Sequence, residues 1–501
     1  MWRTGPSREE RRLAARQRRL IVLAPGSADR AIESPWITRT ILGVVLLVAA
    51  GLRLNGIAGT TLWYDELQAV THAVQPIPDL LTSVLSLDPH PPVWYLQLHL
   101  WMQLGTGNAW LTLNSVVLGV LAVASLYWTT ARTHDTPTAL WAAAFLAVAP
   151  AALIFGQEVR MYAWLMLLAV WSVYLSGRLL QAERALPWAA AYVPVTLLAL
   201  YSQGVAFLLL ACVGTHALFR VLRRDYTRAG FFAWLVSNAL VLVLLVPWLL
   251  RALGIRVGHA SPVSLASLAQ VLGLWTLGET APQGLWSPIF VGLVLVTLAA
   301  VSLRARQRHT LEAVCVCLAP LIVAGSIGLA GDSFLHVRAI AFALPFFALA
   351  CGCAAATLVR GELRLPRVGL ESLRLLAAGL AAVLVLAGWS QTRALPGGSQ
   401  LADVAHSLAT RSAEPRTIFV SQPKDAWGLC WQMVGAGSAR PRLGAGALCA
   451  SAGTRIVHRQ TPPPEHASDR EHWRVERRGR TTVLPEATQT PWRYVVGRLG
   501  P

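Results

Sequence analysis

Residues 109–131, AWLTLNSVVLGVLAVASLYWTTA, contain no charged side chain. A helix of this length rises about 34 Å, which is enough to cross the roughly 30 Å hydrocarbon core of a bilayer. Comparable apolar runs recur along the chain. The sequence therefore predicts an α-helical polytopic membrane protein with about 11 transmembrane helices, at 37–56, 109–131, 138–155, 161–178, 186–203, 204–220, 230–250, 286–303, 311–330, 338–358 and 371–390.

The composition agrees with a membrane protein. Hydrophobic residues make up 55% of the 501 residues, charged residues only 14%, and the mean hydropathy is +0.50. A soluble chain carries about 25% charged residues, so the low charged fraction excludes a set of soluble domains. The high hydrophobic fraction excludes a disordered chain, which has low hydrophobicity. The net charge of +18 indicates topology and contact with membrane lipid rather than a nucleic-acid partner.

Arginine is unevenly distributed between the predicted loops. Cytoplasmic loops of membrane proteins carry an excess of basic residues. Alternate loops here are rich in Arg, namely those near residues 132, 178–184, 220–228, 304–308 and 360–367. We therefore place these loops and the Arg-rich tail 1–36 in the cytoplasm. No cleavable signal peptide is evident, so the first apolar run is predicted to be a retained span of a multi-pass plasma-membrane protein.

This topology divides the chain into regions. Residues 37–390 form the membrane domain, with two large outer loops at 57–108 and 251–285. The apolar segment 91–104 is too short to cross a bilayer, and counting it as a span would move the Arg-rich loops to the outside. It is predicted to be an outer-face juxtamembrane or re-entrant helix.

Hydropathy falls after residue 390. Residues 391–501 are polar and contain three strand-like runs, RTIFVSQ, TRIVHR and WRYVVGRL, together with a helix-like stretch at 399–411. They are predicted to form a small extracytoplasmic α/β domain. Cys430 and Cys449 would lie in an oxidising compartment, where a disulfide between them is one possibility.

The first outer loop begins with TTLWYDELQAVTH (60–72), which contains two adjacent acids. On a helix, Asp65, Gln68 and His72 share one face and Glu66 points elsewhere. One acid is therefore expected to face a site and the other to point away from it. The alternative is a solvated loop that merely begins with two acids.

Three further motifs fall on the same predicted side of the membrane. DPHPPVWYLQLHLW (88–101) has a double-proline corner that holds His90. FGQEVRMYAW (155–164) places Glu158 and Arg160 between two apolar runs, where charge is unfavourable unless it is paired or functional. GDSFLHVRAIAFALPFF (331–347) contains Asp332, His336 and Arg338. Together they indicate one extracytoplasmic site at the membrane boundary, with acids for proton abstraction and Arg for an anion.

The ordered motifs WYDEL, HPPVWYLQLHLW, QEVRMY and VRAIAFALP resemble the GT-C superfamily of membrane glycosyltransferases. The likeness is to its protein O-mannosyltransferase and aminoarabinose transferase branch, which includes bacterial mannosyltransferase-like proteins, and covers roughly residues 37–360. It implies inverting transfer of a mannose or arabinose-like sugar from a polyprenyl-phosphate donor. The acceptor would be an extracytoplasmic glycan, lipid or protein of the cell envelope.

The resemblance also implies residue roles. Asp65 matches the general base best, with Glu66 as an assisting or substituting acid. Glu158 and Arg160 match the second acidic motif, with Glu158 as a further catalytic acid, and Arg338 matches the basic position before the late span. Both arginines would bind the donor phosphate.

Four aromatic and histidine side chains are further candidates for shaping the site or contacting substrate: His72, His90, Tyr95 and Tyr162. No cofactor is implied and no metal ligand is assigned, so dependence on a divalent metal is left open.

Two positions depart from the family pattern. The family often has Arg-Leu-Pro-Ser at the start of the second span, where this chain has TLNS at 112–115, and Ala339 stands where Tyr often follows the late Arg. One alternative is therefore a non-catalytic or degenerate GT-C-like protein. Another is a lipid or sugar transporter, for which His216 and Glu312 are the main ionisable candidates within the spans.

Overall fold

The computed structural model describes residues 34–60, 62, 64–253, 265–278, 286–304, 309–330, 338, 340–363 and 366–393, and four strands further along the chain. The first helices are α3 (Pro35–Leu54), α4 (Tyr64–Ala73), α5 (Ile77–Leu87), α6 (Val93–Met102), α7 (Asn108–Thr133), α8 (Thr136–Val148) and α9 (Pro150–Phe155). They are followed by α10 (Tyr162–Gln181), α11 (Leu186–Leu200), α12 (Leu209–Leu222), α13 (Arg228–Leu253), α14 (Leu265–Leu277), α15 (Trp286–Arg304), α16 (His309–Ala330), α17 (Leu344–Arg360) and α18 (Arg367–Arg393). Short 3₁₀ turns are η1 (Ile57–Gly59), η2 (Ala206–Leu208) and η3 (Ala341–Ala343).

Every predicted span coincides with helix in this structure. Within the described residues, seven helical segments are long and apolar enough to cross a membrane. The other four predicted spans correspond to the shorter apolar helices Thr136–Val148, Leu186–Leu200, Ala206–Leu222 and Ile289–Arg304. The molecule is thus a multi-pass helical membrane protein, and the total of eleven spans stays a prediction.

The predicted span at 138–155 is divided into α8 and α9. Pro150 is the first residue of α9 and has no N–H to continue the preceding helix. The buried guanidinium of Arg53 on α3 donates to the carbonyl groups of Leu146, Ala147 and Ala152 around this break. A cation at the C-terminal end of α8 also complements the helix dipole. The break therefore fixes the direction in which α9 enters the turn that follows it.

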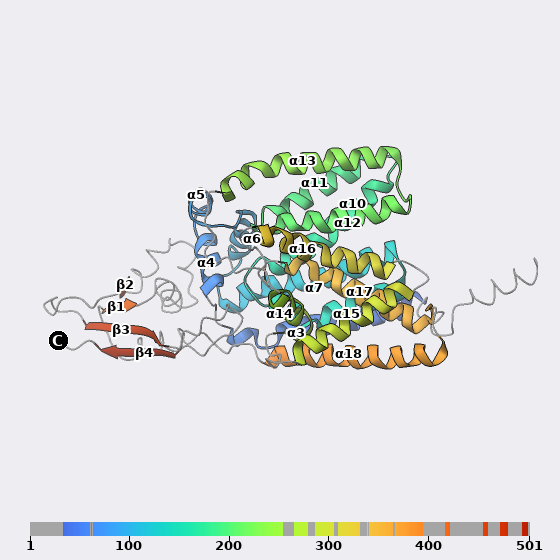
Figure 1. Cartoon of the computed structure of the whole chain (residues 1–501). Helices are drawn as coiled ribbons and strands as arrows, with labels where there is room; N and C mark the ends of the chain where they lie inside the picture. Colours follow the sequence, from blue (N-terminus) through green and yellow to red (C-terminus); the bar gives the residue numbers. More distant parts are fainter. Residues whose placement is uncertain are drawn as a thin grey trace, which may run out of the picture.

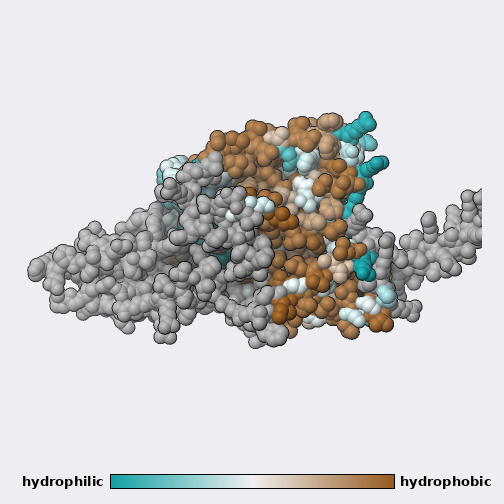
Figure 2. All heavy atoms as spheres, viewed as in Figure 1, coloured by the Kyte–Doolittle hydropathy of each residue, from teal (hydrophilic) through white to brown (hydrophobic). Residues whose placement is uncertain are grey.

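The helices of the segment predicted as the first outer loop gather at one end of the bundle. Figure 1 shows α4, α5 and α6 at the end opposite the loop that joins α12 to α13. Between these ends the long helices present a broad hydrophobic band, bordered by hydrophilic residues on the side of the α12–α13 loop (Figure 2). The short helix α6 confirms that 91–104 contains a helix shorter than a span.

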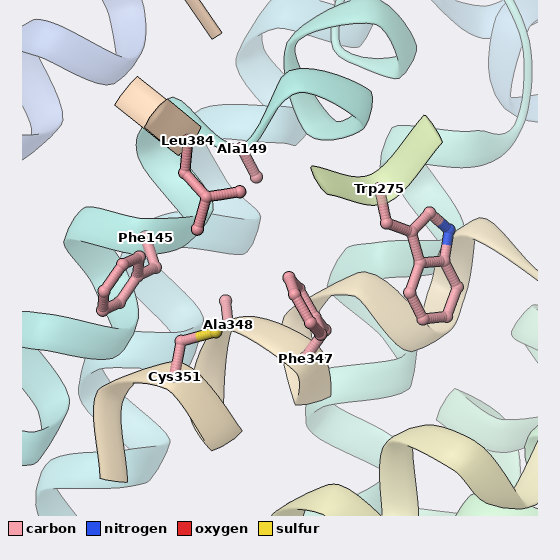
Figure 3. Close-up of a pocket in the computed structure, with 7 residues that line it drawn as sticks. All are labelled: Phe145, Ala149, Trp275, Phe347, Ala348, Cys351 and Leu384. Atoms are coloured by element: carbon pink, nitrogen blue, oxygen red, sulfur yellow. The ribbon is translucent and has the colours of Figure 1, made fainter. Parts of the chain in front are cut away.

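A small apolar cavity lies between α8, α14, α17 and α18 (Figure 3). Its lining offers no ionisable group other than a buried thiol, so the cavity suits hydrocarbon rather than group-transfer chemistry. The lining residues are Phe145, Ala149, Trp275, Phe347, Ala348, Cys351 and Leu384.

Four strands follow the membrane helices: β1 (Arg416–Val420), β2 (Thr454–His458), β3 (Glu471–Arg478) and β4 (Arg493–Arg498). They form one sheet in the order β2-β1-β3-β4, in which β1 is parallel to β2 and β3, and β3 is antiparallel to β4. Three strands lie in the predicted runs, and β3 was not predicted. The α/β domain itself stays a prediction, because the expected helix at 399–411 and both Cys430 and Cys449 lie outside the described residues.

Candidate active site

The two adjacent acids at the start of α4 point in different directions. Glu66 is buried, and its Oε1 accepts a hydrogen bond of 2.7 Å from the backbone N–H of Val159. Asp65 is half-buried, and its backbone carbonyl accepts from Nη1 of Arg160 at 3.1 Å. Among the described residues, the Asp65 carboxylate has no hydrogen-bond partner. The predicted divergence of the two acids is therefore present, and Asp65 is the one left beside a buried arginine.

The turn between α9 and α10 carries the second acidic motif. Glu158 Oε1 lies 3.5 Å from Nη1 of Arg338, which joins two motifs that are far apart in the sequence. The backbone carbonyl of Glu158 accepts from Ser115 Oγ at 2.5 Å. The side-chain amide of Gln157 donates to the backbone carbonyl of Arg53 at 2.7 Å. Contacts from α3, α4 and α7 thus hold this turn.

Asp88, at the double-proline corner, is a central residue that the sequence reasoning missed. Its side chain is 1% exposed. Oδ2 accepts from Gln68 Nε2 at 3.0 Å and lies 3.4 Å from His72 Nε2, while Oδ1 accepts from the backbone N–H of His90 at 2.7 Å. Burial alone would raise the pKa of Asp88, but the contacts with His72 and His90 lower it to about 2. The carboxylate therefore stays ionised and fixes the corner against the face of α4 that contains Gln68 and His72.

His90 and Tyr95 complete this side of the site. Nδ1 of His90 accepts from the backbone N–H of Gly204 at 3.3 Å. Burial and the nearby charge of Arg160 lower the pKa of His90 to about 4, so its ring is neutral at pH 7. The ring of Tyr95 is buried and packs 5.2 Å from that of His72. Its hydroxyl lies in the electrostatic field of both Asp88 and Arg160.

Arg160 lies between these groups. It is buried, and the charges that act on it come from Tyr95, Tyr162, Asp65 and Asp88. Tyr162, at the start of α10, is buried against Phe155 and lies close enough to Arg160 to sense its charge. A guanidinium in this position can neutralise an anion that enters beside Asp65.

Several buried polar atoms at this end of the bundle lack a hydrogen-bond partner within the described part of the chain. Buried polar groups nearly always form hydrogen bonds in folded proteins, so these unpaired atoms require an explanation. A bound ligand that forms hydrogen bonds with them is one such explanation. The unpaired atoms include Thr112 Oγ1, Arg160 Nε and Gln203 Oε1.

The tract that departs from the family pattern has a structural role here. Asn114 exchanges two hydrogen bonds with Gln97 of α6, at 2.9 and 3.0 Å. Together with the bond from Ser115, this contact attaches α7 to α6 and to the acidic turn. The tract therefore supports the site although it lacks the expected arginine.

The residues named for the transporter alternative pair with each other. His216 Nδ1 lies 2.8 Å from Glu312 Oε1, and Arg223 Nη1 lies 2.5 Å from Oε2. They join α12 to the first turn of α16, away from α4. Asp332 and His336 lie outside the described residues. Within the described part, no three His, Cys, Asp or Glu side chains are grouped as metal ligands.

Comparison with solved structures identifies the architecture. ArnT from Cupriavidus metallidurans matches in the apo state with a TM-score of 0.55 and 15% identity, covering 88% of this chain and 93% of that one. The same protein bound to undecaprenyl phosphate matches with a TM-score of 0.53 and 13% identity over 89% and 93%. The chain therefore has the fold of ArnT, as the resemblance to the GT-C superfamily predicted.

Two further comparisons agree with a GT-C fold. The oligosaccharyltransferase AglB from Archaeoglobus fulgidus, in complex with an inhibitory peptide and a dolichol-phosphate, matches with a TM-score of 0.50 and 11% identity over 89% of this chain and 70% of that one. The family model described as dolichyl-phosphate-mannose-protein mannosyltransferase matches residues 89–250. That match includes the double-proline corner and the acidic turn. A search of curated proteins finds no match.

Most of the candidate site residues could be recognised in the sequence, but Asp88 could not. Asp65, Glu158 and Arg160 stand out because they are charged residues beside apolar runs. Asp88 precedes Pro89, and Asp before proline is also typical of an ordinary turn, so its role is not evident from the sequence. The sequence does place it two residues before His90, and that spacing was the signal available.

Proposed function

We propose that this chain transfers a sugar, mannose or an arabinose-like pentose, from a polyprenyl-phosphate donor to an extracytoplasmic acceptor with inversion at the anomeric carbon. The GT-C fold and the name of the matching family model support a polyprenyl-phosphate donor. The uneven distribution of Arg supports an orientation with the N-terminus in the cytoplasm and the site and C-terminal domain outside.

The observation that carries the proposal is the difference between the environments of the Asp65 and Glu66 carboxylates. Glu66 is bound to the backbone of the acidic turn, so we assign it a positioning role instead of the assisting role that the sequence suggested. Asp65 keeps a carboxylate beside Arg160 without a hydrogen-bond partner among the described residues. A general base must be able to reach a substrate proton, and a half-buried carboxylate without a hydrogen-bond partner among the described residues supports this role for Asp65.

The reaction follows from these positions. An acceptor hydroxyl oxygen forms a bond to the anomeric carbon while the bond from that carbon to the phosphate oxygen breaks. Asp65 accepts the hydroxyl proton as the new bond forms, and polyprenyl phosphate leaves with the electron pair. Arg160 and Arg338 offset the charge that develops on the phosphate.

Glu158 takes a supporting role in this scheme. Its carboxylate lies 3.5 Å from Arg338, so it can hold that arginine beside the acidic turn. Its backbone carbonyl is bound by Ser115. We therefore propose that Glu158 positions the donor-binding cation, whereas the sequence suggested a catalytic acid.

A transfer assay tests the proposal. Membranes containing the full chain are supplied with radiolabelled polyprenyl-phosphate mannose or arabinose and envelope acceptor. We expect label to enter acceptor from one of the two donors with the wild type and not with Asp65→Asn. Donor binding without transfer in the wild type would favour the degenerate alternative, and movement of lipid without a new glycosidic bond would favour the transporter.

A further inference from the structure

Gln203 lies in the turn between α11 and η2, outside every motif that the sequence drew attention to. Its side chain is 3% exposed. The amide oxygen Oε1 has no hydrogen-bond partner among the residues that the structure describes. An amide oxygen that is buried and unpaired lowers the stability of the folded protein, because its hydrogen bonds to water are lost on folding and no hydrogen bond within the protein replaces them.

The turn that carries Gln203 is attached to the site on both sides. The carbonyl of Tyr201 accepts from the N–H of Val93 at 3.0 Å, at the start of α6. The N–H of Gly204 donates to His90 at 3.3 Å. A Cβ at Gly204 would lie 2.7 Å from the carbonyl oxygen of Pro89, so the close approach of this turn to the double-proline corner requires glycine.

A third contact joins the turn to α10. Ser202 Oγ accepts from Trp164 Nε1 at 3.0 Å, two residues beyond Tyr162. The neighbours of Gln203 on either side are thus anchored to α6, the His90 corner and α10. Gln203 itself is held in place by its neighbours, and within the described part of the chain no side-chain hydrogen bond explains its burial.

Other buried or half-buried glutamines of the same end are paired. Gln157 donates to two backbone carbonyls, and Gln97 exchanges hydrogen bonds with Asn114. The fold therefore pairs amides at this end where it uses them for structure. Gln203 differs, and a hydrogen-bond donor from a substrate is the partner that its position allows.

We propose that the amide oxygen of Gln203 accepts a hydrogen bond from a hydroxyl group of the bound carbohydrate and so helps to select it. The inference rests on the proposed glycosyl transfer at the Asp65 site. It adds to that site a residue of the α11–η2 turn, which contacts the His90 corner. The hydroxyl belongs either to the transferred sugar or to the acceptor, and these two sources are separated by kinetics.

The test compares Gln203→Leu with Gln181→Leu in the full chain. Leucine has a similar size and removes the unpaired amide, so we expect Gln203→Leu to be as thermally stable as the wild type or more stable. Its kcat/KM should fall about tenfold, the effect expected for the loss of one neutral hydrogen bond. Gln181 Nε2 donates to Asp225 at 2.7 Å at the other end of the bundle. Gln181→Leu should therefore lose stability and keep its activity.

The substrate whose KM rises identifies the source of the hydroxyl. A higher KM for the donor indicates a hydroxyl of the transferred sugar, and a higher KM for the acceptor indicates a hydroxyl of the acceptor. The inference is wrong if Gln203→Leu keeps kcat/KM within twofold of the wild type, or if it unfolds as readily as Gln181→Leu. If the wild type transfers no sugar from any donor, the proposed function fails and this inference fails with it. An active wild type with an unaffected Gln203→Leu overturns only the inference.

Discussion

The carboxylate of Glu66 accepts a hydrogen bond of 2.7 Å from the backbone N–H of Val159, 93 positions further along the chain. This bond joins the first turn of α4 to the acidic turn between α9 and α10. Because Glu66 is turned inward, Asp65 is left beside Arg160. The relative position of the proposed base and the proposed donor-binding cation therefore depends on Glu66.

Removal of Glu66 should damage both stability and activity. Glu66→Ala leaves the N–H of Val159 buried without its acceptor, which should lower the free energy of unfolding by about 1–3 kcal/mol. Glu66→Gln keeps an oxygen in the same place and should retain most of the stability and a measurable fraction of the activity. Thermal unfolding in detergent and the transfer assay check both variants. Equal loss of transfer in Glu66→Gln and Asp65→Asn, with both folded, would contradict the positioning role.

A pair of glycine substitutions tests how tightly Arg53 is enclosed. A Cβ at Gly156 would lie 2.7 Å from Arg53 Nε and 2.9 Å from the carbonyl oxygen of Ala152. Gly156→Ala should therefore destabilise the protein by about 1–3 kcal/mol, as overpacking does. At Gly51, on the same helix as Arg53, a Cβ would meet nothing within 4 Å. Gly51→Ala should raise stability by about 0.5–1 kcal/mol, and the reverse order of the two melting temperatures would contradict the packing described.

Acidification should weaken the His90 corner in two stages. The pKa of His90 is lowered from 6.5 to about 4, so between these values the unfolded chain binds a proton that the folded chain does not, and stability falls as the pH drops. The pKa of Asp88 is lowered from 3.8 to about 2, so its contribution is present above 3.8 and is lost as the pH falls toward 2.

The matching measurement is thermal unfolding as a function of pH for the wild type and His90→Gln. The variant lacks the titrating ring, so its stability should change less between pH 6.5 and 4. A variant with the same slope as the wild type in this window would show that His90 is not the group responsible.

The pair at the other end separates the enzyme from a transporter. Glu312→Gln removes the charge that pairs with His216 and Arg223. The loss of a buried partner should lower stability, while transfer by the folded protein should continue at close to the wild-type rate. Abolished function in a well-folded Glu312→Gln protein would support a transport role for this pair.

Local sequence features were enough to predict the long apolar helices and the divergence of the two acids, but not α5 and α14, which lie in segments predicted only as loops. Apolar run length located every predicted span, and the 3.6-residue repeat separated Asp65 from Glu66. The break before Pro150 was not predicted, because the apolar run continues through it and the contacts from Arg53 that stabilise the break are tertiary.

Residues whose role depends on tertiary contacts could not be predicted from the sequence. Asp88 became central only when α4 folded against the corner, and Gln203 carries no charge or motif. Strand β3, EHWRVERR, was missed because its charged residues hide the alternation that marks a strand. Its neighbours β1 and β4 have the β-branched residues that make strands recognisable.

The most direct test of the account is the turnover of Asp65→Asn with the preferred polyprenyl-phosphate sugar, measured beside donor binding and thermal stability. The account predicts that kcat falls by about 10²–10⁴-fold, the usual contribution of a general base, while donor affinity and melting temperature stay close to wild type. Full turnover by a well-folded Asp65→Asn protein would contradict it.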